Sequence, residues 1–217
     1  MVAAAKRRPA RAGRRRSEIR PAAGPPPACT GAMKLIVGLG NPGRGYEATR
    51  HNVGFEVLEI LSRRAGSPVR RHRFQGEIVQ ASLRGGAALL LWPLTWMNLS
   101  GSSVLAARDF YKIEIQDILV ICDDFQLAQG VIRMRARGSS GGQKGLADVA
   151  RRLGCDAVPR LRIGIGPVPA GWAAADFVLA RFSRDEREEI GPVLERAADA
   201  AEEWAAAGID AAMNRYN

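Results

Sequence analysis

Histidine and cysteine are scarce in this chain of 217 residues, which contains two histidines and three cysteines. Cys29, Cys122 and Cys155 are odd in number and form no C-x-x-C pair. This argues against a disulfide framework or a cysteine zinc site and is typical of a reducing compartment, so we expect a cytoplasmic protein. Because His51 and His72 are the only histidines, we expect no metal centre.

The sequence lacks long apolar runs. Outside the N-terminal segment it also lacks a strong bias toward charges of one sign. No run approaches the roughly 20 apolar residues that span a bilayer, so no transmembrane helix is predicted. The net charge is +10, but residues 1–33 contribute +7 of it through eight basic side chains and Glu18. The remaining residues carry 24 basic and 21 acidic groups, a net of +3. Bulk charge alone therefore does not indicate a nucleic-acid partner.

The first 32 residues are rich in Ala, Pro, Gly and Arg and almost lack large apolar side chains. We interpret residues 1–32 as disordered, because such a segment cannot bury enough surface to offset its chain entropy. Three origins compete: an upstream start assigned in error with Met33 as the true start, a basic tail with weak affinity for RNA, or an organelle transit peptide. The transit peptide is least favoured, because Ser17 and Thr30 are the only hydroxyl residues in this segment.

From Met33 onward, strand-like and helix-like patterns alternate. Strands are predicted at residues 34–39, 118–122, 131–137 and 161–165, with a hairpin formed by residues 74–83 and 87–92. Helices are predicted at residues 52–64, 100–111, 142–153 and 183–207, with Asn98 or Ser100 capping the second and Ser183 with Glu186 forming a capping box on the last. This interleaving predicts an α/β fold: one domain over residues 33–217, with a mixed twisted β-sheet flanked by helices on both faces.

A glycine pattern follows the first predicted strand. Gly38-Leu-Gly40-Asn-Pro-Gly43 satisfies G-x-G-x-x-G, which by itself suggests dinucleotide binding. In dinucleotide sites the helix opens within the motif, and an acidic ribose ligand follows about 20 residues later. Here the loop continues, the helix begins about ten residues later, and no such acid ends a following strand. We favour a glycine turn that brings the backbone close to whatever binds there.

Several motifs follow one another along the chain: Gly38–Gly43 with Tyr46, Thr49-Arg50-His51-Asn52-Val53-Gly54, Thr95-Trp96-Met97-Asn98-Leu99-Ser100-Gly101, Asp123, the turn 138–145, Leu161-Arg162-Ile163-Gly164-Ile165-Gly166, and the C-terminal Met213-Asn214-Arg215-Tyr216-Asn217. In this order they resemble the bacterial peptidyl-tRNA hydrolase family. The resemblance implies an enzyme, without cofactor, that hydrolyses the ester between a peptide and the 3′-terminal ribose of tRNA. Such an enzyme recycles tRNA from peptidyl-tRNA released by stalled or aborted translation.

His51 is the candidate general base. It stands at a loop mouth near the carboxyl end of a strand, where ligands of α/β sheets collect. An imidazole has a reference pKa of about 6.5, so at neutral pH it is mostly free to accept a proton from water. Asp123, directly after strand 118–122, could reach His51 and fix its tautomer. In the family, the matching histidine is catalytic and the matching aspartate supports it. The other histidine, His72, lies among arginines, and we assign it to the solvated surface.

Ester hydrolysis also needs donors for the developing oxyanion, and Asn41 and Asn98 are the candidates. An isolated asparagine is more often a turn or cap residue. The resemblance favours the functional role, because the matching asparagines line the family's site and hold the peptide part of the substrate. Tyr46 and Met97 match positions beside the cleft, as substrate contacts or as core residues.

The turn near residue 143 departs from the family's frequent Gly-Gly-His-Asn-Gly. It reads Gly141-Gly142-Gln143-Lys144-Gly145. We place Lys144 among the substrate-binding residues, since its ammonium could stabilise an oxyanion or pair with a phosphate. It cannot accept a hydrogen bond, so its role differs from that of an asparagine.

Contact with RNA is predicted at Arg133, Arg135 and Arg137. In a strand these alternate residues would project from one face about 7 Å apart, a spacing that suits phosphates, with a solvated basic face as the alternative. Arg162 should lie close by, and in the family the residues matching Arg135 and Arg162 belong to the region that grips tRNA. We therefore expect a monomer that recognises the acceptor region of tRNA by shape and phosphate contacts.

A non-catalytic RNA-binding relative, of the kind seen among plastid intron-splicing factors, is the main alternative. The joint presence of His51, Asp123, Asn41 and Asn98 favours the enzyme, because RNA binding alone would not require that set.

Overall fold

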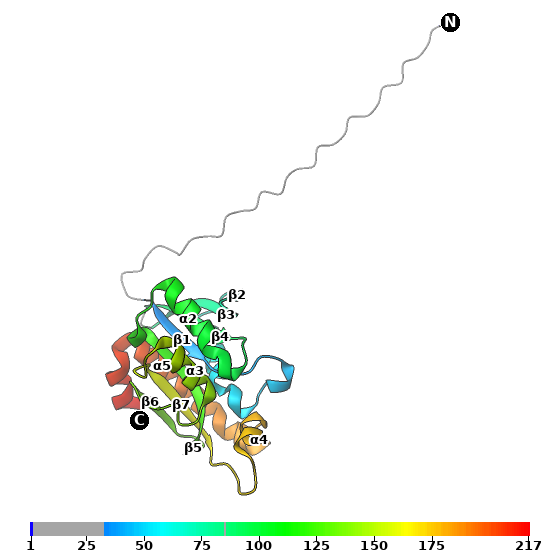
Figure 1. Cartoon of the computed structure of the whole chain (residues 1–217), viewed down its shortest axis with the longest axis vertical. Coiled ribbons are helices and arrows are strands. Elements are labelled where there is room, and N and C mark those ends of the chain that lie inside the picture. The colour runs from blue at the N-terminus through cyan, green and yellow to red at the C-terminus, as the bar shows by residue number, and fades with distance from the viewer. Residues whose placement is uncertain (2–32, 85) are drawn as a thin grey trace.

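A seven-stranded mixed sheet forms the centre of the computed structural model, which describes residue 1, residues 33–84 and residues 86–217 (Figure 1). The prediction of a disordered tail therefore falls, apart from Met1, outside the described residues. The strands are β1 (Lys34–Gly38), β2 (Arg71–Arg73), β3 (Gly76–Leu83), β4 (Gly86–Pro93), β5 (Ile118–Ala128), β6 (Ile132–Arg135) and β7 (Arg160–Gly166). They follow the order β2-β3-β4-β1-β5-β7-β6. Strands β4, β1, β5 and β7 are parallel, whereas β3 and β6 run against their neighbours.

Helices cover both faces of this sheet, as the α/β prediction requires. Helices α1 (Val53–Arg64) and α5 (Arg184–Tyr216) pack on one face, α2 (Ser100–Tyr111) and α3 (Lys144–Leu153) pack on the other, and α4 (Ala174–Leu179) is a short segment near the end of β5 (Figure 1). Successive side chains of a strand point to opposite faces, so Ile36 joins the first core while Leu35 and Val37 join the second. No helix among the described residues is long and apolar enough to cross a membrane.

The helix caps were predicted correctly at one position and wrongly at another. The capping box on α5 is confirmed, because Ser183 Oγ accepts from the Glu186 N–H at 3.2 Å and Glu186 Oε2 accepts from the Ser183 N–H at 2.6 Å. The prediction that Asn98 or Ser100 caps α2 is wrong. The buried Asp148 of α3 accepts from the Gly101 N–H at 2.8 Å, so a neighbouring helix supplies the carboxylate.

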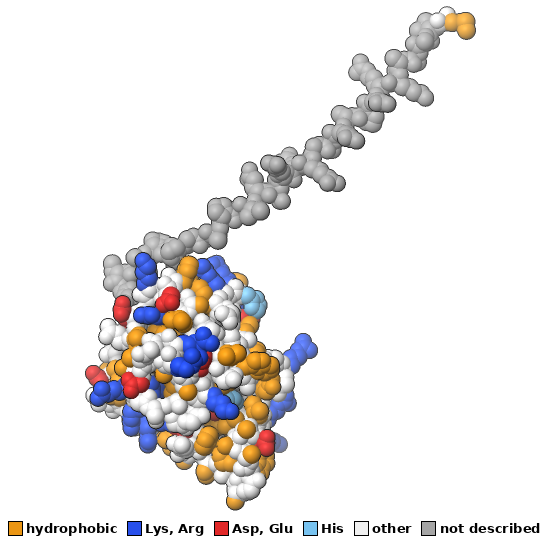
Figure 2. All heavy atoms as spheres, viewed as in Figure 1, with side chains coloured by type: hydrophobic (Ala, Val, Ile, Leu, Met, Phe, Trp, Pro, Cys, Tyr) orange, Lys and Arg blue, Asp and Glu red, His pale blue; other side chains and the backbone are white. Residues whose placement is uncertain are grey.

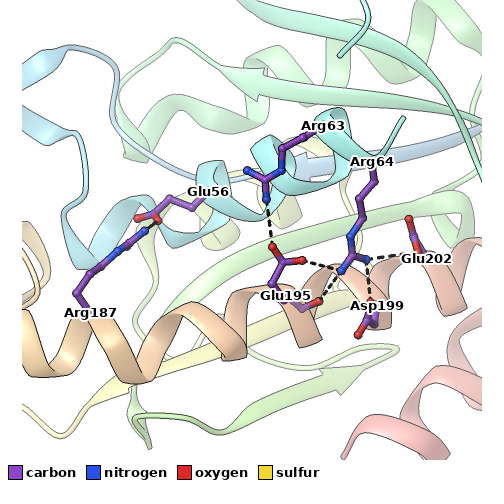
Figure 3. A network of polar contacts seen from close by, with 7 residues as sticks. All are labelled: Glu56, Arg63, Arg64, Arg187, Glu195, Asp199 and Glu202. Carbon is purple, nitrogen blue, oxygen red and sulfur yellow. Dashed lines mark hydrogen bonds and ion pairs between the residues drawn. The ribbon is translucent and has the colours of Figure 1, made fainter. Parts of the chain in front are cut away.

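Ion pairs join α1 to α5 along their exposed sides (Figure 3). Arg64 reaches Glu195 at 2.7 Å and Asp199 at 2.8 Å, while Arg187 reaches Glu56 at 2.5 Å. Pairs of this exposed kind contribute roughly 0–1 kcal/mol each. Burial of the apolar faces therefore dominates the packing of α5, and the ion pairs fix its register on α1.

Helix α1 begins directly on the main chain of β1 and β5. A Cβ atom at Gly54 would lie 2.6 Å from the carbonyl oxygens of Ile121 and Leu39, and one at Gly38 would lie 2.3 Å from the Gly54 carbonyl oxygen. A Cβ at Gly40 would meet the Phe55 ring at 2.8 Å. The first two glycines of the G-x-G-x-x-G match thus serve close helix–strand packing, which brings the residues before α1 to the carboxyl ends of the strands.

Replacing Gly54 with alanine is expected to lower the free energy of unfolding by about 1–3 kcal/mol, because the added methyl group must displace main chain. Chemical denaturation measures this loss. Gly45→Ala is the matched control, since a Cβ at Gly45 meets nothing within 4 Å. Equal stability of the two variants would contradict the close-packing account.

Candidate active site

A cleft of about 540 Å³ opens beyond the carboxyl end of β1 and beside β5 and β7. It is lined by residues from seven segments: Asn41, His51, Trp96, Met97, Asn98, Asp123, Asp124, Phe125, Ser140, Gly141, Gly142, Gln143, Lys144, Arg162, Ala174, Ala175, Val178 and Leu179. Seven of the eleven residues predicted from the sequence as site residues therefore face one cavity, and the other four are Tyr46, Arg133, Arg135 and Arg137.

His51 and Asp123 meet inside this cleft. His51 lies in η2 (Arg50–Asn52), just before α1, and its Nδ1 is 2.8 Å from Asp123 Oδ2. The aspartate side chain is 2% exposed and the imidazole 13%. An ionised carboxylate only accepts hydrogen bonds, so a neutral imidazole in this contact would donate from Nδ1 and keep the lone pair of Nε2. The expected approach of Asp123 to His51 is thus present in the structure.

Arg50 fixes the segment that carries His51. Its side chain is buried, donates to Glu186 at 2.7 Å and 2.8 Å and to the Arg181 carbonyl at 2.9 Å, and stacks on Phe177 with 4.5 Å between guanidinium and ring centre. The link between α4 and α5 therefore holds η2 in place.

The Arg50–Glu186 pair makes stability depend on pH. Burial raises the pKa of Glu186, but hydrogen bonds from the Ser183 main chain and from Arg50 outweigh it and leave the pKa below its ordinary value. A carboxyl whose pKa is lowered by folding stabilises the protein above its unfolded pKa, and that contribution disappears as pH falls through the folded pKa.

Glu186→Gln is accordingly expected to cost about 2 kcal/mol at pH 7, since a charge-assisted hydrogen bond to a buried guanidinium is lost. The difference from the wild type should shrink as pH falls through the lowered pKa of the native carboxyl, where the carboxylate becomes protonated. Denaturation at several pH values measures it. Glu188→Gln, at an exposed residue paired with Arg184, is the control and should change little. A pH-independent difference would contradict this assignment.

Gln143 binds the second oxygen of Asp123. Its Nε2 is 3.1 Å from Asp123 Oδ1 and 3.2 Å from Met97 Sδ, and its Oε1 accepts from the Leu146 N–H at 2.8 Å as the N-cap of α3. Sequence reasoning noted Gln143 only as a departure from the family's turn. The predicted helix began at residue 142, two residues before α3 begins at Lys144, so the N-cap position of Gln143 was not recognised.

Asn41 is held by its neighbours in a defined orientation. Its main chain exchanges hydrogen bonds with the Asn52 side chain at 2.8 Å and 3.0 Å, and its Oδ1 accepts from the Met97 N–H at 2.9 Å. Because its oxygen is committed to the main chain, the group that Asn41 can offer to a ligand is the Nδ2 donor. Asn52, which sequence reasoning did not single out, is what fixes it.

The remaining predicted residues take different positions around the cleft. Asn98, exposed in η3 (Met97–Leu99), and Lys144, in the first turn of α3, both line it, as does the buried Met97. Tyr46 is not among the residues that line the cleft, but its ring meets that of Trp96 edge-on with 6.0 Å between centres. Tyr46 therefore supports a residue of the cleft wall.

The predicted row of arginines is shorter than expected. Arg133 and Arg135 are exposed on β6, but β6 ends at Arg135, so the prediction that Arg137 shares their strand face is wrong. The chain leaves the strand there to reach the turn at Gly138, whose φ is 138°. Strand pairing sets Arg133 opposite Arg162, which lines the cleft and pairs with Asp124 at 2.8 Å.

Arg160 adds a buried positive charge beneath this region. Its guanidinium donates to the carbonyls of Gly138 at 2.6 Å, Ser139 at 3.2 Å, Asp156 at 2.8 Å and Val158 at 2.6 Å. Burial lowers the pKa of Arg160. These carbonyl contacts hold the turn that leads from β6 to the cleft.

An imidazole on a buried carboxylate, beside amide donors and basic groups, has the parts that hydrolysis by activated water requires. The fold and the cleft thus define a candidate hydrolase with an α/β architecture. A sequence profile of the family described as peptidyl-tRNA hydrolase matches residues 35–217. The chain belongs to the peptidyl-tRNA hydrolase family and is an enzyme of that family.

Individual relatives agree with this assignment. A peptidyl-tRNA hydrolase of Rhodopirellula baltica is 51% identical over 186 residues, covering 85% of this chain and 97% of the relative. One of Chloroflexus aggregans is 47% identical over 186 residues, covering 85% and 99%. The crystal structure of peptidyl-tRNA hydrolase from Acinetobacter baumannii superposes with a TM-score of 0.79 at 34% identity, covering 85% of this chain and 94% of that one.

Proposed function

We propose that this enzyme cleaves the ester between a peptide, or an N-blocked amino acid, and the 3′-terminal ribose of tRNA, with His51 as general base. The 2.8 Å contact between His51 Nδ1 and Asp123 Oδ2 inside the cleft carries the proposal, because it leaves Nε2 as the basic nitrogen. The products would be free tRNA and a peptide carboxylate. The cell would thereby recover tRNA from stalled or aborted translation.

In the proposed reaction His51 Nε2 takes a proton from water as the oxygen attacks the ester carbonyl. The carbonyl oxygen gains negative charge, and the Nδ2 groups of Asn41 and Asn98 donate to it. The bond to the ribose oxygen then breaks, and the imidazolium returns its proton to that leaving oxygen. Asp123 stabilises the imidazolium between these two transfers.

The peptide part of the substrate is proposed to lie along the remaining walls of the cleft. Met97 and Asn98 form one wall, Lys144 adds a positive charge, and Tyr46 backs Trp96. Apolar side chains gather on the end of the molecule that carries α4, where Trp172 and Leu179 are exposed (Figures 1 and 2). Because these surfaces are largely apolar, they suit a peptide chain better than a polynucleotide.

The acceptor region of tRNA is proposed to bind Arg133, Arg135, Arg137 and Arg162. If Arg133 and Arg135 each neutralise a phosphate, the double variant Arg133→Ala/Arg135→Ala should weaken tRNA binding about tenfold. The slope of log affinity against log salt should fall by about 1–2. Titration at several salt concentrations measures both quantities. Arg63→Ala, in the α1–α5 network, is the control, and an unchanged salt slope in the double variant would contradict this site.

A turnover assay with N-acetylated aminoacyl-tRNA tests the proposed activity. Multiple-turnover release of free tRNA by the full chain, without added metal or cofactor, is the expected result. Binding without release would favour the alternative of a non-catalytic RNA-binding relative. We further propose that residues 33–217 act as a monomeric catalytic unit in the cytoplasm.

A further inference from the structure

We propose that Gln143 is a positioning residue for the reaction: it holds the Asp123 carboxylate so that Oδ2 faces His51. The inference rests on the proposed function, in which Asp123 orients the base. In this role Gln143 acts through Asp123 and not by contact with the ester.

The contacts of Asp123 show why its orientation needs a second donor. One oxygen faces His51 Nδ1 at 2.8 Å and the other faces Gln143 Nε2 at 3.1 Å, and the side chain is 2% exposed. A carboxylate withdrawn from water requires a donor on each oxygen, and a single contact would let it rotate about its Cβ–Cγ bond. Gln143 supplies the contact that removes this freedom.

The orientation of the Gln143 amide is itself determined. The Leu146 main-chain N–H can only donate, and it lies 2.8 Å from Oε1. The oxygen of the amide must therefore face Leu146, which turns Nε2 toward Asp123. A carboxamide does not titrate, so it stays a donor at every pH at which the protein is folded.

The alternative is that Gln143 serves only as the N-cap of α3. The two roles can be separated by chemistry. Serine is a preferred N-cap residue but is too short to reach Asp123. Glutamate keeps the length of the side chain and an oxygen for the Leu146 N–H, but it places a second carboxylate against Asp123.

The test measures kcat and KM with N-acetylated aminoacyl-tRNA, together with the denaturation midpoint, for Gln143→Ser, Gln143→Glu and the wild type. We expect kcat to fall about 10–100-fold in Gln143→Ser, with KM within about twofold, at a temperature at which the variant is fully folded. Removing a contact that orients a metal-bound histidine typically has an effect of that size, and the same size is expected for this contact. Wild-type kcat in Gln143→Ser, or a loss of kcat no larger than its unfolded fraction explains, would overturn the proposal.

Gln143→Glu provides a second readout that a helix cap would not affect. Two neighbouring carboxylates cannot both ionise easily, so the introduced carboxyl should bind a proton and become a donor as pH falls. The ratio of its kcat to the wild-type kcat should therefore rise by about tenfold between pH 8 and pH 5, and a flat ratio would contradict the role. Wild-type protein without turnover would overturn the proposed function as well, whereas turnover unaffected by both variants overturns only the role of Gln143.

Discussion

His51→Ala is expected to reduce the rate of ester cleavage by about 10²–10⁴-fold, the range that general-base catalysis supplies. The tRNA should still bind with nearly unchanged affinity, because the predicted phosphate contacts lie on β6, on β7 and in the segment directly after β6. Single-turnover kinetics with saturating enzyme measures the chemical step, and a binding titration measures the affinity.

His72→Ala is the matched control for this experiment. His72 is 77% exposed on β2, and its ring lies 3.5 Å from Glu77, so its removal should leave the cleavage rate unchanged. Equal losses in the two variants would show that the effect of His51→Ala is not specific to the cleft. An undiminished rate in His51→Ala would exclude this residue as the base.

Asp123→Asn is expected to lower kcat by about 10³–10⁴-fold, although the side chain keeps its size. Gln143 Nε2 is a donor, so the new amide would turn its oxygen toward Gln143 and its NH₂ group toward His51 Nδ1. Nδ1 would then have to accept, and the ring proton would move to Nε2, the nitrogen proposed to take a proton from water. Steady-state kinetics at saturating substrate measures the loss.

Asp117→Asn is the control for the carboxylate, because Asp117 precedes the amino end of the same strand and pairs with Lys34 at 2.6 Å. It should retain wild-type kcat. If Asp123→Asn retained it as well, the tautomer would not be set by the Asp123 contact.

The alternation of apolar runs and glycines was enough to predict the sheet and the helices on both faces. Strand β1 reads as a continuous apolar run because both of its faces are buried. Strand β5 continues to Ala128, six residues beyond its predicted end. The prediction stopped early because the buried acids Asp123 and Asp124 interrupt the apolar pattern. Strand β2, exposed throughout, and the short α4 carry no apolar period, so the sequence did not reveal them.

In helix α5 the sequence pattern located a break in the helix but did not predict the helical residues that follow it. The predicted end at residue 207 is where the regular helix breaks, since Gly208 has φ 84° and ψ 178°. The chain then resumes a helical path to Tyr216, which the sequence pattern up to residue 207 did not predict.

Within the site, sequence reasoning found pairs that converge on one sheet edge and missed contacts that depend on tertiary structure. His51 and Asp123 are 72 residues apart, but the sequence pattern placed both near the carboxyl ends of neighbouring strands, which made their approach predictable. The approach of Gln143 to Asp123 depends on how α3 docks, and the Asp124–Arg162 pair depends on the register of β5 and β7. No local pattern encodes either of these.

The tautomer of His51 is the quantity that the whole account depends on, and nitrogen NMR of protein labelled with ¹⁵N-histidine observes it directly. At a pH where the ring is neutral, we predict a proton on Nδ1 and none on Nε2, with the signals changing in Asp123→Asn. A neutral ring protonated on Nε2 in the wild type would contradict the account, because its basic nitrogen would then face Asp123 instead of water.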